Sequence, residues 1–348
     1  MTAAVGLLRR HTLLRSLTIV AAVGLLLWLL TLGLSDYRNE QLARGAYYFA
    51  ALAGLTVLAG LSGQISLGHG ALMAVGAYTA ALLIGREGWP VSLALAASVV
   101  TTGVVGIPVG IAASRLRGPY LAGATLALAV GLPSLADQYP SLLGGENGLT
   151  VNPPIPPSWL GSSFSLSRWE AWVAVLGALL VLFVLYNILH SGSGRSLRAV
   201  RDDEIAASLC GLRISRTQAT AFVLSAACAG LGGGLLAAVV EQLAAKGAFG
   251  IQLSLYLLAG VVIGGLGSLG GAFWGAALLV LLPNWTNDLA SSFSLSTNVS
   301  NNLPLAIYGL ILIGLVLLWP SGIQGGIRAG RRSVSARRAH RRTPSSAA

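Results

Sequence analysis

Ten apolar segments, separated by short polar connections, are the feature that most limits what this chain can fold into. A helix needs about 20 consecutive apolar residues to cross a bilayer, and most of the segments approach that length. Only 9% of the 348 residues are charged, whereas soluble domains carry about 25%. The sequence therefore predicts an all-α, polytopic helical membrane protein with about eight to ten transmembrane segments. The segments cover residues 17–34, 46–61, 67–84, 91–113, 119–136, 171–189, 217–240, 251–265, 269–283 and 303–319.

The positions of the basic residues predict how these segments are oriented. Lys and Arg concentrate in the cytoplasmic loops of membrane proteins. Ten crossings that start from a cytoplasmic N-terminus place most of the 22 basic residues on the cytoplasmic side, and the C-terminus then lies there too. We therefore interpret the net charge of +11 as an orientation signal and expect no nucleic-acid partner.

The chain is expected to form one transmembrane domain, residues 1–324, followed by a basic tail, residues 325–348, that is predicted to be disordered. The connection 137–170 contains five prolines and is expected to form a stiff, irregular cap on the outside. A second outside loop covers residues 284–302.

Three of the apolar segments are short for straight spans. We expect them to be tilted, broken or re-entrant, because irregular backbone at membrane depth must be covered by protein. They are 46–61, 251–265 and 269–283, of which the last two are a candidate re-entrant hairpin.

The polar loop 191–217 is the longest polar interruption between two apolar segments. Five arginines bracket its acidic triplet, and the charge distribution places the loop in the cytoplasm. Asp202 or Asp203 is expected to cap a short helix over residues 204–210, because carboxylates accept hydrogen bonds from the first turn of a helix. Gly211 is expected to end that helix.

A second polar stretch, residues 62–78, reads SGQISLGHGALMAVGAY and lies between two apolar segments. Its singled-out residues are Gly63, Gln64, Ser66, Gly68 and His69. Polar groups at membrane depth are commonly functional or buried in protein, and glycines permit close approach of helices. Two interpretations stay open: a part of a translocation pathway, or a tight turn with a hydrogen-bonded histidine.

Catalytic and cofactor signatures are missing from the sequence. The one lysine, Lys246, follows no phosphate-binding glycine loop, so the chain cannot hydrolyse ATP by that route. The four histidines are scattered, which predicts no metal site. Residues 265–270 match Gly-x-Gly-x-x-Gly without the strand–turn–helix context of a dinucleotide site, so we expect a closely packed membrane hairpin there. The chain is expected to be neither an enzyme nor a holder of a cofactor.

Four blocks of the sequence resemble the permease subunits of branched-chain amino-acid ABC importers. The blocks are GQISLGH at 63–69, GPYLA with TLA at 118–127, GGENGL at 144–149, and GVVIGGLGSLGGAFWG at 260–275. Together with the polar loop they cover residues from about 45 to 320. In that family the longer of two paired permeases has an additional N-terminal span, and segment 17–34 fits it.

The resemblance implies a function for the polar loop. In such permeases a short cytoplasmic helix seats in a groove of the ATP-binding subunit. The residues that match it are Arg201, Asp202, Asp203, Glu204, Ala206, Ala207 and Gly211. The alternative interpretation of the loop is a solvated amphipathic segment with no docking function.

The resemblance also implies the partners and the transport mechanism. The partners are two cytoplasmic ATP-binding subunits, a homologous second permease and an extracytoplasmic solute-binding protein, all assembled at the bacterial inner membrane. Branched-chain or related amino acids would cross by alternating access, and urea or short amides are an alternative cargo. An ion-coupled secondary transporter and a channel-like or structural membrane subunit are alternatives from other classes.

Overall fold

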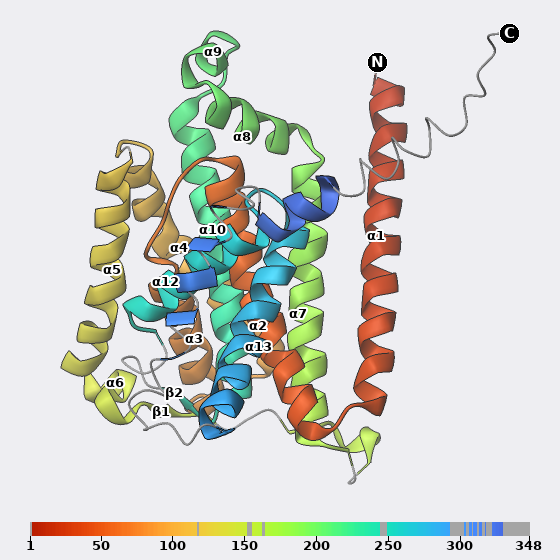
Figure 1. Ribbon diagram of the computed structural model, residues 1–348, viewed down its shortest axis with the longest axis vertical. Coiled ribbons are helices and arrows are strands. Elements are labelled where there is room, and N and C mark those ends of the chain that lie inside the picture. The colour runs from red at the N-terminus through yellow and green to blue at the C-terminus, as the bar shows by residue number, and fades with distance from the viewer. Residues whose placement is uncertain are drawn as a thin grey trace, which may run out of the picture.

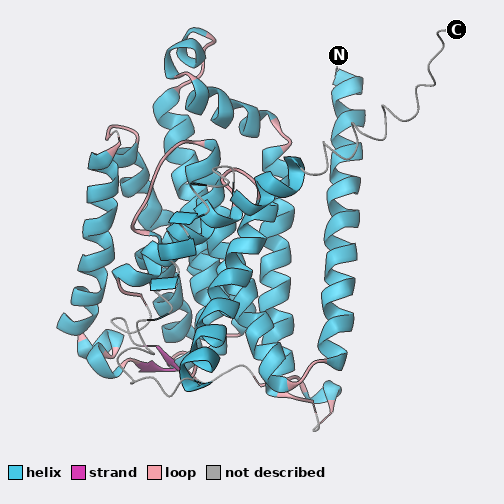
Figure 2. Ribbon diagram, viewed as in Figure 1, coloured by secondary structure: helices cyan, strands magenta, loops and turns pink. Residues whose placement is uncertain are grey.

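The computed structural model describes residues 2–116, 118–151, 155–161, 164–243 and 249–292, together with scattered positions between 303 and 329. In this part of the chain, seven helices are long and apolar enough to cross a membrane, and two shorter apolar helices accompany them. The helices form one elongated bundle (Figure 1). Almost all the described backbone is helical (Figure 2), which confirms the predicted all-α, polytopic membrane fold.

The long helices are α1 (Thr2–Gly33), α2 (Asp36–Leu61), α4 (Val91–Ala113), α5 (Pro119–Gln138), α7 (Leu166–Leu189), α10 (Ile214–Val239) and α13 (Leu269–Ser292). The shorter apolar helices are α3 (His69–Gly85) and α12 (Ile251–Gly264). Two polar helices, α8 (Gly192–Asp202) and α9 (Glu204–Leu209), join α7 to α10. The remaining elements are α6 (Pro140–Leu143), the 3-10 helices Gly145–Asn147 and Ser158–Leu160, and the strands β1 (Leu149–Thr150) and β2 (Gln242–Leu243).

Two segments that looked too short to cross the membrane are longer in the structure. Helix α2 begins at Asp36, ten residues before the expected start at 46, because a helix continues through polar residues once it leaves the apolar layer. Helix α13 continues through Pro283 to Ser292. The prediction that residues 284–302 form a loop is therefore wrong as far as Ser292, and residues 293–302 lie outside the described part of the chain.

Segments 67–84 and 251–265 do form short helices, α3 and α12. A non-helical stretch, residues 62–68, separates α2 from α3. Helix α12 turns into α13 at the glycine-rich residues 265–268, where a Cβ on Gly264 would lie 2.0 Å from the carbonyl oxygen of Gly271. The glycines at 265–270 thus form the close helical hairpin that the sequence predicts. The tenth expected segment, 303–319, falls largely outside the described residues.

The two ends of the bundle carry different connections. The start of α1, the α4–α5 connection and the α8–α9 pair lie at one end, whereas α6, β1 and β2 lie at the other (Figure 1). These connections therefore lie on alternating sides of the bundle, as the predicted orientation from the basic residues requires. Which end faces the cytoplasm stays a prediction.

The proline-rich connection is irregular, as expected, but it is anchored by a strand pair that the sequence did not reveal. β1 pairs antiparallel with β2, and the Val151 amide donates to the Glu241 carbonyl at 2.9 Å. Residues 322–329 are helical, so the tail that was expected to be disordered from residue 325 begins inside a helix. Its remainder lies outside the described residues.

Helix α10 lies at the centre of the bundle, where its glycines let neighbouring backbones come into contact. A Cβ on Gly233 would lie 1.8 Å from the Met73 carbonyl oxygen of α3, and one on Gly230 would lie 2.5 Å from the Thr102 side chain of α4. Lipid tails are as apolar as leucine, so membrane helices associate through such close packing more than through the hydrophobic effect. The small residues of α10 therefore hold the bundle together.

Substituting Gly233 with Ala tests this packing. The added methyl group overlaps the α3 backbone, so we expect a loss of about 1–3 kcal/mol of stability, measured as a lower melting temperature of the detergent-solubilised protein. Gly131→Ala in α5 is the matched control, because a Cβ there meets no atom within 4 Å. Equal melting temperatures for the two variants would contradict the packing argument.

Candidate functional site

The polar loop 191–217 is a pair of helices, α8 and α9, that project from one end of the bundle (Figure 1). Helix α8 buries Gly194, Leu197 and Val200, which recur at three-residue spacing and form one face of the helix. A Cβ on Gly194 would lie 2.6 Å from the carbonyl oxygens of Ile188 and Leu189. Glycine at this position allows α8 to turn sharply off the end of α7.

Helix α9 begins with a side-chain cap. The Asp203 carboxylate accepts hydrogen bonds from the amides of Ile205 at 2.8 Å and Ala206 at 3.0 Å. Of the two expected caps, Asp203 therefore fills the role, while Asp202 ends α8. The helix ends one residue earlier than expected, at Leu209.

The end of α9 is closed by a glycine turn. Gly211 has a φ of +83°, a conformation that glycine adopts at little cost. The Leu212 amide then donates to the Ala207 carbonyl at 3.1 Å, and the Gly211 amide to the Ser208 carbonyl at 2.9 Å. A fixed cap and a fixed end make this six-residue helix a defined surface.

Helix α9 presents large apolar side chains away from the bundle. Ile205 is 76% exposed and Leu209 is 84% exposed. Ala206 is exposed beside them, but Ala207 is buried and faces the bundle, so only the first of the two alanines can meet a partner in this conformation. The Gln218 amide donates to the Glu204 carboxylate at 2.9 Å and ties the start of α9 to α10.

Arg201 connects the helix pair to the rest of the bundle. Its Nη1 donates to the Gly60 carbonyl oxygen near the end of α2 at 2.6 Å. Its Nε and Nη2 donate to Asp202 Oδ1 at 2.9 and 2.6 Å. A cation at this place satisfies a carbonyl that the end of a helix leaves free and complements the negative end of the helix dipole.

The contacts of Gly60 and Gly63 allow Arg201 to reach the bundle. Gly63 has a φ of +72°, and a Cβ there would lie 3.1 Å from the Arg201 Cγ. A Cβ on Gly60 would lie 2.1 Å from the backbone nitrogen of Gly267. The polar loop, the end of α2 and the α12–α13 turn therefore meet at one point, which we call the Arg201 junction (Arg201, Gly60, Gly63 and Gly267).

His69 follows the non-helical stretch 62–68 as the first residue of α3 and is fully buried. Its Nδ1 lies 3.0 Å from the Ser66 hydroxyl and its Nε2 lies 2.7 Å from the Ser225 hydroxyl of α10. Both ring nitrogens are thus hydrogen-bonded inside the protein, as the turn interpretation of this motif expected. The role of the motif in transport stays a prediction.

Backbone contacts fix the rest of this stretch between neighbouring helices. The Leu67 amide donates to the Thr125 hydroxyl at 2.9 Å, and a Cβ on Gly68 would lie 2.6 Å from the Thr125 carbonyl oxygen. Gln64 is buried, and its amide nitrogen donates to the Ser62 hydroxyl at 3.1 Å, while its Oε1 has no hydrogen-bond partner among the described residues. Thr125 and Ser225 complete the site. The sequence offered no spacing that could link them to His69.

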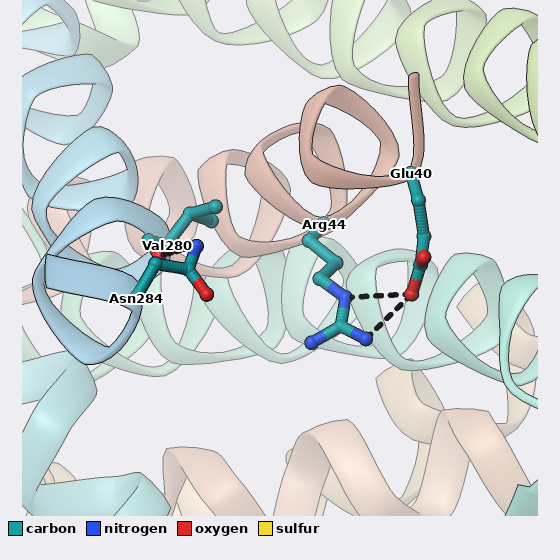
Figure 3. A network of polar contacts seen from close by, with 4 residues as sticks. All are labelled: Glu40, Arg44, Val280 and Asn284. Carbon is teal, nitrogen blue, oxygen red and sulfur yellow. Dashed lines mark hydrogen bonds and ion pairs between the residues drawn. The ribbon is translucent and has the colours of Figure 1, made fainter. Parts of the chain in front are cut away.

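An ion pair that the sequence analysis did not predict joins Glu40 and Arg44 within α2 (Figure 3). Arg44 Nη2 lies 2.5 Å from Glu40 Oε1, one helical turn away, and the two side chains are 52% and 40% exposed. The carboxamide of Asn284 on α13 lies across from the guanidinium in the figure and bonds the Val280 carbonyl oxygen at 2.8 Å. Arg44 follows the start of α2 by eight residues, or about 12 Å along the helix.

The described residues contain no group of His, Cys, Asp or Glu side chains that could hold a metal ion. The fold and the site together define a multi-pass membrane protein that presents a capped helix at one end. A family model described as "Branched-chain amino acid transport system / permease component" matches residues 37–318. The chain belongs to this family of transport permeases.

Individual relatives refine the comparison. The chain is 33% identical over 294 residues to the high-affinity branched-chain amino acid permease protein LivM of Salmonella typhimurium strain LT2, and 32% identical to LivM of Escherichia coli K12. Each match covers 78% of this chain and 66% of the relative. LivH of Escherichia coli K12 is 27% identical over 297 residues, covering 81% of this chain and 92% of the relative. No solved structure matches the chain.

His69 offers a test of the buried hydrogen bonds that join the stretch 62–68 to α10. His69→Leu leaves the Ser225 hydroxyl without its partner and removes one of the two bonds of the Ser66 hydroxyl, so we expect a loss of about 1–3 kcal/mol of stability in thermal melts. Adding Ser225→Ala should recover part of that loss, because it removes the unpaired hydroxyl, while Ser66 still accepts from the Gly68 amide. His190→Leu, at an exposed position, serves as the control and should melt like the wild type. Full stability of the single His69 variant would refute the hydrogen-bond account.

Proposed function

We propose that this chain is a membrane subunit of an ATP-binding-cassette importer and that α9 is the helix that docks on a cytoplasmic ATP-binding subunit. The observation that carries the proposal is the exposed apolar face of α9, Ile205 and Leu209, on a helix that Asp203 and Gly211 hold in shape. Large apolar side chains on a rigid, otherwise polar projection are typical of an interaction surface. A loop that was merely solvated would need neither the cap nor the exposed leucine and isoleucine.

The Arg201 junction supports a route by which docking moves the bundle. A displacement of α9 acts on α8 through Asp203, and Arg201 carries it to Gly60 at the end of α2. From there the non-helical stretch 62–68 leads to His69, which is hydrogen-bonded to Ser225 on the central helix α10. Rigid helices joined by short hydrogen bonds transmit such a movement well. In this mechanism ATP is hydrolysed in separate subunits, and the chain alternates the side on which its pathway opens.

The partners follow from the family. LivM and LivH relatives bear the names of two permease proteins of the same transport system, and this chain is similar to both. We infer that it pairs with a homologous second permease, with two ATP-binding subunits at the α8–α9 end and a solute-binding protein at the end that carries β1 and β2. The complex would reside in the bacterial inner membrane.

A branched-chain or related amino acid is the cargo that the relatives' names suggest, and the ion pair in α2 supports an amino acid over urea or a short amide. Arg44 and Glu40 place a positive and a negative group side by side and partly exposed. A zwitterion carries a carboxylate and an ammonium group that match this pair, whereas a neutral amide gains little from it.

An ion-coupled transporter is the alternative from another class. Its best candidate for a titrating group at membrane depth is His69, but both ring nitrogens are bonded to serines. Uptake in membrane vesicles that contain the candidate partner subunits separates the two classes. The importer predicts uptake that needs ATP and stops with vanadate, and uptake driven by a proton gradient without ATP would overturn it.

Gly211→Asp tests the docking helix. The substitution forces an unfavourable φ and adds a charge beside α9, so we expect uptake to fall at least about tenfold while ATP hydrolysis and membrane insertion persist. Gly88→Asp is a matched control at the other end of the molecule, because Gly88 has a φ of +64° and a Cβ there also meets open space. Wild-type uptake by the Gly211 variant would exclude α9 as the docking helix.

Arg44→Gln tests the choice of cargo. The variant keeps a polar side chain but loses the charge that would meet a carboxylate, so the KM for leucine should rise about tenfold with vanadate-sensitive ATP hydrolysis unchanged. Arg86→Gln, at the same end of the bundle, controls for the loss of one positive charge. A KM that stays at the wild-type value in the Arg44 variant would remove this argument for an amino acid.

A further inference from the structure

A cleft of about 360 Å³ opens between α1 and α7. Its walls are almost entirely apolar and include Gly24, Leu27 and Trp28 of α1 together with Trp172, Leu176 and Leu179 of α7. No function described so far uses this cleft, and its position is remote from the polar loop and from His69.

Two hydrogen bonds fasten α1 to α7 along the cleft. Near one end the Ser16 hydroxyl donates to the Asn187 side-chain oxygen at 3.1 Å. Near the other end the Trp172 indole donates to the Thr31 hydroxyl at 2.9 Å. Gly24 lies between these two bonds, and a Cβ there would lie 3.0 Å from the Leu179 Cδ1 of α7, so α1 also comes close to α7 at this position.

The outer side of α1 beside the cleft is apolar and exposed. Only 6% of the most apolar part of α1 is buried in the protein, and Leu25, Leu26 and Leu29 on its outer side are more than half exposed. The family model begins at residue 37, so α1 is an addition to the matched domain. An occupant of the cleft would therefore join an appended helix to the bundle.

A positive charge, Arg168, lies beside the cleft without lining it and is connected to it by aromatic rings. The Arg168 guanidinium carbon lies 5.5 Å from the centre of the Phe164 ring, which contacts the Trp172 ring at 5.0 Å. Trp172 in turn lies 6.4 Å from Trp28 across the cleft. This chain of contacts connects the charge directly to the apolar walls.

Arg168 and its neighbour have unmet hydrogen-bonding capacity. Within the described residues Arg168 forms no ion pair, and its Nε is buried without a hydrogen-bond partner. Trp169, which does line the cleft, has a buried indole nitrogen that also lacks a hydrogen-bond partner among the described residues. Unmet donors in an apolar setting are costly, so a ligand with strong acceptor oxygens would be favoured there.

We propose that a glycerophospholipid binds in this cleft, with an acyl chain between α1 and α7 and its phosphate at Arg168. The apolar walls suit a hydrocarbon chain, and tryptophans with a nearby arginine are the usual neighbours of a headgroup at the membrane interface. The guanidinium and the indole supply donors for the phosphate oxygens once their side chains turn toward them. The lipid holds α1 against the bundle.

Photolabelling of the complete transporter in native membranes tests the proposal. The probe is phosphatidylglycerol with a diazirine near the end of one acyl chain, and the labelled positions are mapped by peptide mass spectrometry. We expect labels to concentrate on the facing residues of α1 and α7, and diacylglycerol with the same diazirine to label them about tenfold less. Even labelling of all lipid-facing helices, equal labelling by diacylglycerol, or a cleft left unlabelled in the assembled transporter would overturn it.

Two variants keep the test independent of folding. Arg168→Gln should reduce labelling of the cleft about tenfold by removing the phosphate contact, whereas Arg38→Gln, an exposed arginine on α2, should leave it unchanged. Leu176→Trp fills the cleft without altering the charge and should also abolish labelling. Labelling at the wild-type level in both the Arg168 and the Leu176 variants would exclude the site. Because labelling requires no transport, the result stands apart from the proposed importer function.

Discussion

Direct contact between helix backbones at glycine residues is the constraint on which this structure depends. A bilayer offers helices little hydrophobic reason to associate, so close packing must supply the attraction. The central helix α10 achieves it through Gly230 and Gly233, where any side chain would overlap a neighbouring helix. The same device appears at Gly60 and Gly267, where the end of α2 meets the α12–α13 turn.

Close contact also explains how a surface helix can influence the interior. Arg201 reaches the Gly60 carbonyl beside the very point at which α2 touches Gly267. A movement of α8 at this junction cannot be absorbed by flexible side chains, because backbones are already in contact there. The junction thus offers a physical link between the proposed docking helix and the helices of the bundle. The lipid proposed beside α1 would stabilise the packing of α1 against α7 and would take no part in this link.

Much of the fold could be predicted from the sequence because it depends on local patterns. The apolar segments identified every long helix among the described residues, and the side-chain cap of α9 was narrowed to Asp202 or Asp203, since a carboxylate before a helix acts within one turn. Helix α8 was missed, although Leu197 and Val200 stand at helical spacing, because five arginines made the stretch look like a solvated loop. The polar start of α2 and the end of α13 were missed because helices continue beyond their apolar part.

The site was less predictable because its contacts join distant parts of the chain. Arg201 and Gly60 are 141 residues apart, and His69 and Ser225 are 156 residues apart. Neither pair leaves a spacing pattern in the sequence, and serines such as Ser225 occur throughout membrane helices. Ala206 and Ala207 looked equivalent as small residues, yet only the helix geometry shows that one is exposed and the other buried.

The most direct test of this account is the ratio of transported solute to hydrolysed ATP in an Arg201→Gln variant of the reconstituted transporter. The account predicts that ATP hydrolysis continues while the ratio falls at least about tenfold, because the link from α8 to α2 loses its charge-assisted hydrogen bond. Arg195→Gln on the same helix should keep the wild-type ratio. An unchanged ratio in the Arg201 variant, with the protein folded and assembled, would contradict the central claim.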